Sequence, residues 1–191
     1  IYGSLSDKYA GLFSSLGANA EIKNLGMVDV DIDLSSSRDV GALAGYGSGT
    51  AVVNNCYVSG SITSYAHFND YNRCVSGFIG TGSVTGNNET LVSNCINEAN
   101  IKNTYSESGA YGIAGSYAIS NNCINMGTVC YPTTNPIYGG SAKDCYSLNG
   151  SNQSSSGATM KTADQLKESE TYTGYDFDNT WEIDPDCSYP Y

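Results

Sequence analysis

The fold is decided by the stretch Gly41-Ala42-Leu43-Ala44-Gly45, which is followed by Val53-Asn54-Asn55-Cys56 and then by Ile62. These motifs recur along the chain in the same order. Copies of the pentad, in which small residues flank an apolar centre, begin at positions 10, 76 and 111, and a weak copy lies at 138–140. The centres are Leu12, Leu43, Phe78 and Ile113, which lie 31, 35 and 35 positions apart. A repeat of this length indicates structural units that stack on one another.

A second motif places Asn before Cys at a similar distance after the pentads. It ends at Cys56, Cys95 and Cys123. In the first copy Leu25 stands in place of the Cys, and in the last copy Cys145 follows Asp in place of Asn. A position that accepts Leu or Cys is apolar and internal, since both side chains are often buried. We expect the Asn itself in a turn, where it bonds backbone groups or stacks in an outer Asn ladder.

These motifs predict an all-β fold of about 4 to 5 stacked coils. Each coil offers about three short strands, which bury an apolar face only when neighbouring coils lie ~4.8 Å above and below. The segment 27–34 alternates apolar and acidic residues, as a half-buried strand does. Stacking predicts three core columns, which are Leu12/Leu43/Phe78/Ile113, Leu25/Cys56/Cys95/Cys123/Cys145 and Ile22/Val53/Val92/Ile119.

The repeat pattern stops after Ser147, which divides the single domain into two parts. We assign residues 1–157 to the repeats and residues 158–191 to a C-terminal cap. Thr162 suits the N-cap of a short helix over 163–167. Phe177 and Trp181 are the large apolar side chains that we expect to cover the open end of the stack.

The pentads, followed by Ile-x-Asn-Cys and Asn-x-Gly, resemble the GLUG repeat over about residues 10–147. This repeat occurs in bacterial immunoglobulin A peptidases, haemagglutinin-like proteins and surface proteins of gut bacteria. Ser14, Ser76 and Tyr111 depart from its glycines. The resemblance implies a right-handed parallel β-helix (β-solenoid) in a secreted or cell-surface protein, with a non-catalytic part in adhesion or display.

The composition narrows the classes of partner that the chain can bind. The 191 residues carry 8 Lys and Arg against 19 Asp and Glu, a formal charge of -11. Such a chain has no basic stripe for phosphates or an anionic leaflet, so we expect neither nucleic acid nor direct membrane insertion. Because no Met precedes Ile1, we expect a portion of a longer protein. We also expect a monomer, whose cap prevents end-to-end stacking.

The seven cysteines do not match a known metal framework. Cys56, Cys95, Cys123 and Cys145 are 39, 28 and 22 residues apart, which fits no zinc finger or ribbon. We expect buried packing, with disulfides between coils as the alternative, because ~4.8 Å lies within the Cα range of a bridge. Three further cysteines, Cys74, Cys130 and Cys187, lie off the column. We expect no cofactor.

One insertion in the second coil collects the aromatic residues that suit a sugar. It contains Tyr65, His67, Phe68 and Tyr71, and Tyr105 lies in the next insertion. The two alternatives are a glycan-stacking platform and an ordinary solvated loop. His67 is the single histidine, and no nucleophile motif such as GxSxG accompanies it, so we do not expect a hydrolase triad.

Three acidic residues, Asp29, Asp31 and Asp33, alternate along the segment 27–34. Carboxylates at this spacing present oxygens on one strand face, and oxygens are the ligands that calcium requires. The alternative is a solvated outer face, because the Gly-rich nonapeptide of calcium-binding β-rolls is missing. We assign no metal site and keep these three as weak calcium candidates.

Together with the repeats, the resemblance to the GLUG family implies a non-catalytic extracellular β-solenoid module for adhesion, display or spacing on a bacterial surface protein. Its partners would be a host or bacterial glycan or a matrix protein. The alternative functions are a polysaccharide-binding or polysaccharide-cleaving β-helix and an accessory module of a secreted peptidase. Glycosidase chemistry requires two carboxylates about 5 to 10 Å apart in a cleft, and no motif in the repeats signals such a pair.

Overall fold

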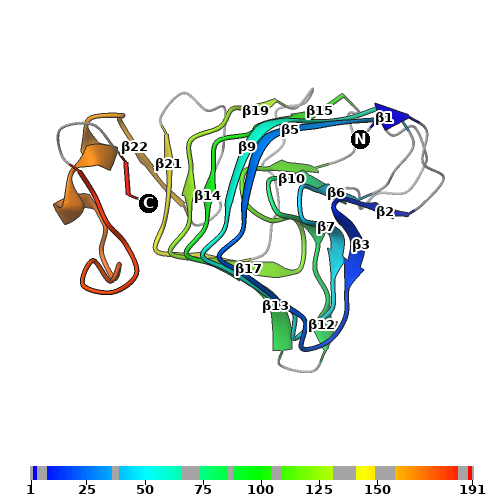
Figure 1. The fold of residues 1–191 in the computed structure, drawn as a ribbon, viewed down its shortest axis with the longest axis horizontal. Helices are drawn as coiled ribbons and strands as arrows, with labels where there is room; N and C mark the ends of the chain where they lie inside the picture. The colour runs from blue at the N-terminus through cyan, green and yellow to red at the C-terminus, as the bar shows by residue number, and fades with distance from the viewer. Residues whose placement is uncertain are drawn as a thin grey trace.

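A computed structural model gives the fold of the chain. It describes residues 2–3, 8–35, 39–65, 74–85, 88–104, 109–130, 141–148, 158–184 and 189–190. This part of the chain is all-β, and strands from successive repeats lie side by side and parallel (Figure 1). The four repeats occupy residues 9–34, 39–64, 74–103 and 109–130, and strands at 142–148 and 158–161 continue the pattern.

The largest sheet of the described residues runs in the order β1-β5-β9-β14-β18-β21-β22, and β15 pairs with β9 on one side and with β19 on the other. Its strands are β1 (Tyr2–Gly3), β5 (Gly26–Leu34), β9 (Tyr57–Ser64), β14 (Ile96–Asn97), β15 (Asn100–Asn103), β18 (Ile124–Asn125), β19 (Val129–Cys130), β21 (Cys145–Leu148) and β22 (Ala158–Lys161). Each strand pairs with its counterpart in the next repeat, and β14 with β15, like β18 with β19, takes the place that one long strand fills in the first two repeats.

Three further sheets complete the described structure. The first contains β2 (Tyr9–Ala10), β6 (Asp39–Gly41), β10 (Cys74–Ser76) and β16 (Gly109–Tyr111), and the second contains β3 (Phe13–Leu16), β7 (Ala44–Gly47) and β11 (Ile79–Thr81). The third contains β4 (Glu21–Lys23), β8 (Val52–Asn54), β12 (Val84–Thr85), β13 (Asn88–Ser93), β17 (Ala118–Asn121) and β20 (Ala142–Lys143). All of their pairings are parallel except β12 with β13.

The register places equivalent residues of successive repeats over one another. Ala44 pairs with Ile79, which forms a bridge to Ala114, so the preceding residues Leu43, Phe78 and Ile113 share one position. The Leu43 N–H donates to the Phe78 carbonyl at 3.1 Å, and the Phe78 N–H donates to the Ile113 carbonyl at 2.9 Å. All three side chains are buried. These pentads therefore build one core column across three repeats.

Two expected members do not fit their columns. Leu12 has the register of Leu43, yet 52% of its surface is exposed, because β3 is an edge strand of its sheet in the described part of the chain. Ile119 pairs with Leu91, and Ser120 pairs with Val92 in the column of Val53. Val53 and Val92 lie three residues before their cysteines, whereas Ile119 lies four before Cys123, so Ser120 takes the column position and Ile119 is out of line.

A β-bulge interrupts the alternation expected for 27–34. The register of β5 against β9 shifts between Met27 and Val30, where Asp29 has a left-handed φ of 54° and the next residue, Val30, pairs with Gly60, with φ 117°. Ile32 and Leu34 are buried as a half-buried strand requires, but Val28 is 68% exposed. The alternation therefore holds only after the bulge, and Asp29 is displaced from the line of Asp31 and Asp33.

The C-terminal segment begins as a strand and continues as a cap. Strand β22 pairs with β21 and belongs to the stack. Two 3-10 turns follow, at Gln165–Lys167 and Ser169–Thr171, in place of the expected helix over 163–167. The Gln165 N–H donates to Thr162 Oγ1 at 3.2 Å, and the Thr162 N–H donates to Gln165 Oε1 at 3.0 Å. This reciprocal pair is a capping box, as Thr162 suggested.

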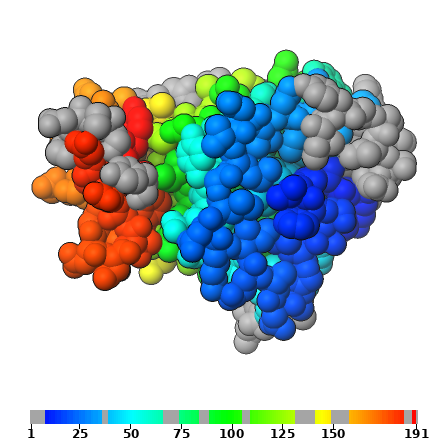
Figure 2. Space-filling model, viewed as in Figure 1, coloured from blue at the N-terminus to red at the C-terminus, as the bar shows by residue number. Residues whose placement is uncertain are grey.

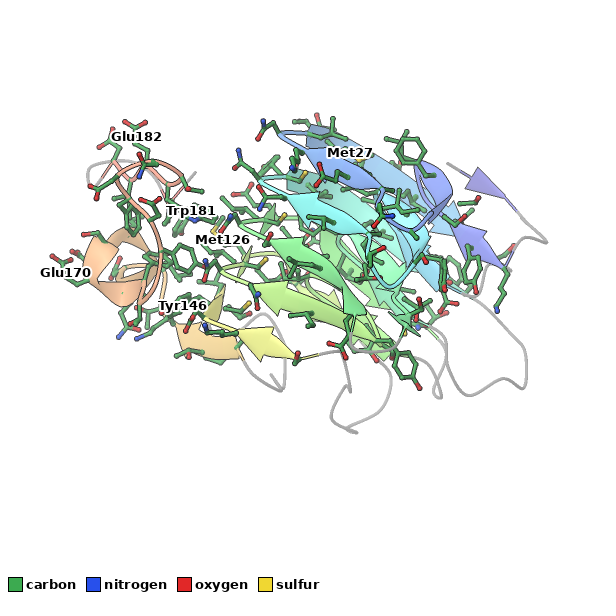
Figure 3. All side chains as sticks on the ribbon, turned by 90° about the horizontal axis from the view of Figure 1, so that it is seen from below. Met27, Met126, Tyr146, Glu170, Trp181 and Glu182 are labelled. Atoms are coloured by element: carbon green, nitrogen blue, oxygen red, sulfur yellow. The ribbon has the colours of Figure 1, made fainter. Side chains whose placement is uncertain are left out.

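The cap lies beside the stack and not over its end. Figure 3 shows the repeats in successive layers, with the cap at one side, and Figure 2 shows the orange and red cap against green and cyan repeats. The outer face of the largest sheet carries Ile96, Ile124 and Tyr146, which pack against Leu166, Tyr172, Tyr175 and Trp181 of the cap, and Phe177 is partly buried there. Because burial of this apolar face is favourable, the large side chains of the cap pack here and not at the open end of the stack.

Among the described residues, no helix combines the length and the apolar character that crossing a lipid bilayer requires.

Candidate functional site

The expected glycan platform is described at one residue only. Tyr65 directly follows β9, its N–H donates to the Leu34 carbonyl at 2.9 Å, and its side chain is 41% exposed. His67, Phe68, Tyr71 and Tyr105 lie outside the described residues. The platform therefore stays a prediction.

The three acidic residues of β5 do not form one line of oxygens. Asp29 sits in the bulge, where its N–H donates to Ser59 Oγ at 3.3 Å, while Asp31 is exposed and Asp33 is half-buried. Among the described residues, no group of three or more His, Cys, Asp or Glu side chains is arranged to hold a metal ion. The bulge is the physical reason why the spacing in the sequence does not translate into a common face.

The cysteine column follows the expected register. Gly26, Tyr57, Ile96, Ile124 and Tyr146 are paired in sequence along the sheet, so the residues before them, Leu25, Cys56, Cys95, Cys123 and Cys145, occupy one position. The four thiols are buried and free. Each lies 3.0 to 3.3 Å from the carbonyl oxygen two residues earlier. These weak hydrogen bonds give every thiol a partner without a disulfide or a metal.

Burial controls the reactivity of the thiols. It raises the pKa of Cys74 to about 11 and the pKa of Cys123 above its usual value. Cys130, by contrast, is exposed. Because a buried thiol is out of reach of the reagent, we expect iodoacetamide at pH 8 to label Cys130 in the native chain and to leave Cys56, Cys95 and Cys123 unlabelled until urea unfolds it. Peptide mass spectrometry after each treatment measures this, and native labelling of the column would contradict the packing.

The Asn before Leu25, Cys56, Cys95 and Cys123 forms an outer ladder of two hydrogen-bonded pairs, one of the two arrangements expected from the sequence. Asn24, Asn55, Asn94 and Asn122 have φ values of 56°, 53°, 52° and 50°, in the left-handed region that Asn tolerates better than most residues. Asn55 Nδ2 donates to Asn24 Oδ1 at 2.7 Å, and Asn122 Nδ2 donates to Asn94 Oδ1 at 3.4 Å. The ladder therefore marks the corner at which every repeat turns into the largest sheet.

A second, inner pair of asparagines has no counterpart in our sequence expectations. Asn97 and Asn125 are buried and lie in the same register, and Asn97 Nδ2 donates to Asn125 Oδ1 at 2.7 Å. Asn97 Oδ1 also accepts from the Ala99 N–H at 3.2 Å. The signal in the sequence is the triplet Cys-Ile-Asn, which occurs at 95–97 and again at 123–125. Its Asn points inward because the Cys two positions earlier does.

A groove runs between the outer ladder and the cap. It has a volume of about 340 Å³ and is lined by residues of three repeats and one cap residue, namely Asn24, Leu25, Gly26, Asn55, Cys56, Tyr57, Asn94, Ile96 and Trp181. Tyr57 Oη donates to Glu98 Oε2 at 2.6 Å, which fixes the ring at the rim. Figure 3 shows Trp181 between the cap and the stack. Sequence reasoning missed this groove because it assigned Trp181 to the open end.

The lining of the groove is neutral. Its polar groups are the side-chain amides of Asn24, Asn55 and Asn94, the Tyr57 hydroxyl and the Trp181 indole N–H, and no lining residue is charged. Trp181 is only 5% exposed, and its Nε1 atom is buried without a hydrogen-bond partner. A buried donor without a partner is unusual in native proteins and calls for an explanation.

Comparison with known proteins adds no assignment. No family model, no curated protein and no solved structure matches the chain. The sequence motifs and the geometry described above are therefore the basis for any function.

Proposed function

We propose that the chain is a right-handed parallel β-helix of the GLUG-repeat type, and that it serves as a non-catalytic extracellular module for adhesion, display or spacing on a bacterial surface protein. The observation that carries this proposal is the parallel register of equivalent residues across successive repeats. Strand pairs such as Val53 with Val92 and Ile101 with Val129 join residues that lie 39 and 28 positions apart. One coil placed on the next is the simplest path for such a chain.

A stack of this kind suits a mechanical role. Each repeat contacts its neighbours, and every further repeat adds ~4.8 Å of length without changing the layers below it. Backbone hydrogen bonds run along the stack at each corner, for example from Asn24 N to Asn54 O at 3.2 Å and from Asn94 N to Asn121 O at 3.0 Å. A partner held by such a module is therefore kept at a fixed distance from whatever anchors it.

The acidic surface fits an extracellular setting with glycans or matrix proteins as partners. With a net charge of -11, copies of the chain repel one another, which favours the monomer. Neutral glycans and basic matrix proteins are not repelled by this charge. The family resemblance adds the bacterial surface, and it also allows an accessory module within a secreted peptidase.

Adhesion is tested with beads that carry the purified chain. We expect these beads to be retained on immobilised mucin glycans or matrix proteins under flow, in contrast to beads that carry a globular protein of similar size and charge. Equal release of both bead types from every surface would contradict adhesion and leave display or spacing.

The non-catalytic part of the proposal has its own test. We expect no new reducing ends and no unsaturated products when the chain is incubated with a panel of plant, fungal and bacterial polysaccharides, with a commercial polysaccharide lyase as the positive control. Turnover of any polysaccharide would show that the cleaving alternative is the correct one.

A further inference from the structure

We propose that the groove between the outer Asn ladder and the cap binds a neutral carbohydrate, through amides of successive repeats and the indole N–H of Trp181. This site is distinct from the aromatic insertion at Tyr65. It goes beyond the module described above, because a spacer would perform its role with this groove empty.

The first argument is the unpartnered donor. Trp181 lines the groove and is only 5% exposed. Its Nε1 atom has no acceptor within the described residues. The ring packs against Tyr175, with the ring centroids 4.9 Å apart, and Nε1 itself is covered from solvent. A ligand oxygen in the groove would supply the acceptor that the chain does not.

The second argument is a break in the ladder inside the groove. Asn55 uses Nδ2 for Asn24, and Asn94 uses Oδ1 for Asn122. Within the described residues no hydrogen bond joins Asn94 to Asn55, so Asn94 Nδ2 and Asn55 Oδ1 face a ligand as one donor and one acceptor. A hydroxyl group satisfies both at once, since it accepts one hydrogen bond and donates another.

The third argument concerns charge and shape. A lining without charges selects a neutral ligand, and Leu25 and Ile96 provide apolar surface beside the amides, which matches a sugar ring with its hydroxyl edge and C–H face. A peptide is disfavoured, because a peptide binds to sheets by adding a strand, and the strands beside this groove, β5, β9 and β14, are already paired to one another. A volume of about 340 Å³ suits one or two sugar units.

The test is an array of neutral oligosaccharides, printed beside uncharged twelve-residue peptides and probed with the fluorescently labelled full chain. We expect binding to neutral oligosaccharides. Asn94→Gly removes the amide and keeps the left-handed backbone, and we expect it to weaken the affinity about tenfold, the equivalent of one well-formed hydrogen bond. Trp181→Phe keeps an aromatic ring in the cap and removes the N–H, and we expect a loss of about three- to tenfold.

Asn19→Gly is the matched control, because Asn19 is an exposed asparagine that also has a left-handed backbone, with φ 63° against 52° for Asn94, but neither lines the groove nor bonds to a residue that does. We expect it to bind as the parent chain does, and thermal melts of all variants verify folding. The proposal is overturned if no oligosaccharide binds, if peptides alone bind, or if Asn19→Gly loses as much affinity as Asn94→Gly. None of these results would alter the polysaccharide-cleavage assay, so the non-catalytic module is judged separately.

Discussion

Replacing Phe78 by alanine is expected to lower the free energy of unfolding by about 3 to 5 kcal/mol, the usual cost of removing a buried aromatic side chain. Phe78 is among the largest fully buried side chains of the described core, and it lies between Leu43 and Ile113 in the pentad column. Its neighbours above and below belong to other repeats, whose backbones are hydrogen-bonded into sheets and cannot collapse into the space. Urea unfolding followed by circular dichroism measures the change.

Leu12→Ala is the control, since Leu12 occupies the same register but is 52% exposed. We expect its cost to stay within about 0.5 kcal/mol, as for most surface positions. Comparable losses at Leu12 and Phe78 would show that the first repeat is covered as fully as the third. Small losses at both would mean that the pentads do not form the core column.

The columns could be predicted from the sequence because each one depends on an apolar residue at a fixed place in the repeat. Leu43, Phe78 and Ile113 are flanked by small residues, and a buried apolar residue with room for the next backbone on either side is compatible with few other structures. The Asn before Cys56 and Cys95 was equally informative, because a corner with a left-handed φ accepts few residues other than Gly, Asn and Asp.

The groove could not be predicted, because it depends on a contact that no local pattern specifies. The cap packs on Ile96, Ile124 and Tyr146, which follow the column cysteines and therefore point outward. Three large outward side chains in one register do signal a face that needs cover, and this clue was available in the sequence. The path of the chain after β22 determines which segment covers the face. It also brings Trp181 to the Asn ladder, and neither result can be read from a local pattern.

The bulge at Asp29 was hidden for a different reason. The bulge brings Val30 against Gly60 one repeat later, where the Val30 carbonyl oxygen leaves no room for a Cβ. A period-two pattern reports the faces of an ideal strand, and it carries no information about which neighbour forces an extra residue.

Replacing Asn97 by alanine is expected to cost about 2 to 5 kcal/mol, because it leaves two buried groups without partners. These are the Ala99 N–H, which donates to Asn97 Oδ1, and Asn125 Oδ1, which accepts from Asn97 Nδ2. The space is closely filled, since a Cβ on Gly77 would lie 2.8 Å from Asn97 Cγ. A loss of this size, measured by urea unfolding, would identify the inner pair as part of the core.

Asn122→Gly separates this effect from the loss of an amide as such. Asn122 is half-buried on the outer ladder, its hydrogen bond to Asn94 is long at 3.4 Å, and glycine accepts its left-handed φ, so we expect a change within about 0.5 kcal/mol. Similar losses in the free energy of unfolding for Asn97→Ala and Asn122→Gly would mean that neither the inner pair nor the outer ladder contributes more than a surface turn does. A large cost at Asn97 alone would mean that the repeats are held in register by a buried polar contact between layers as well as by apolar packing, since an amide pair is satisfied in one alignment and an aliphatic column tolerates several.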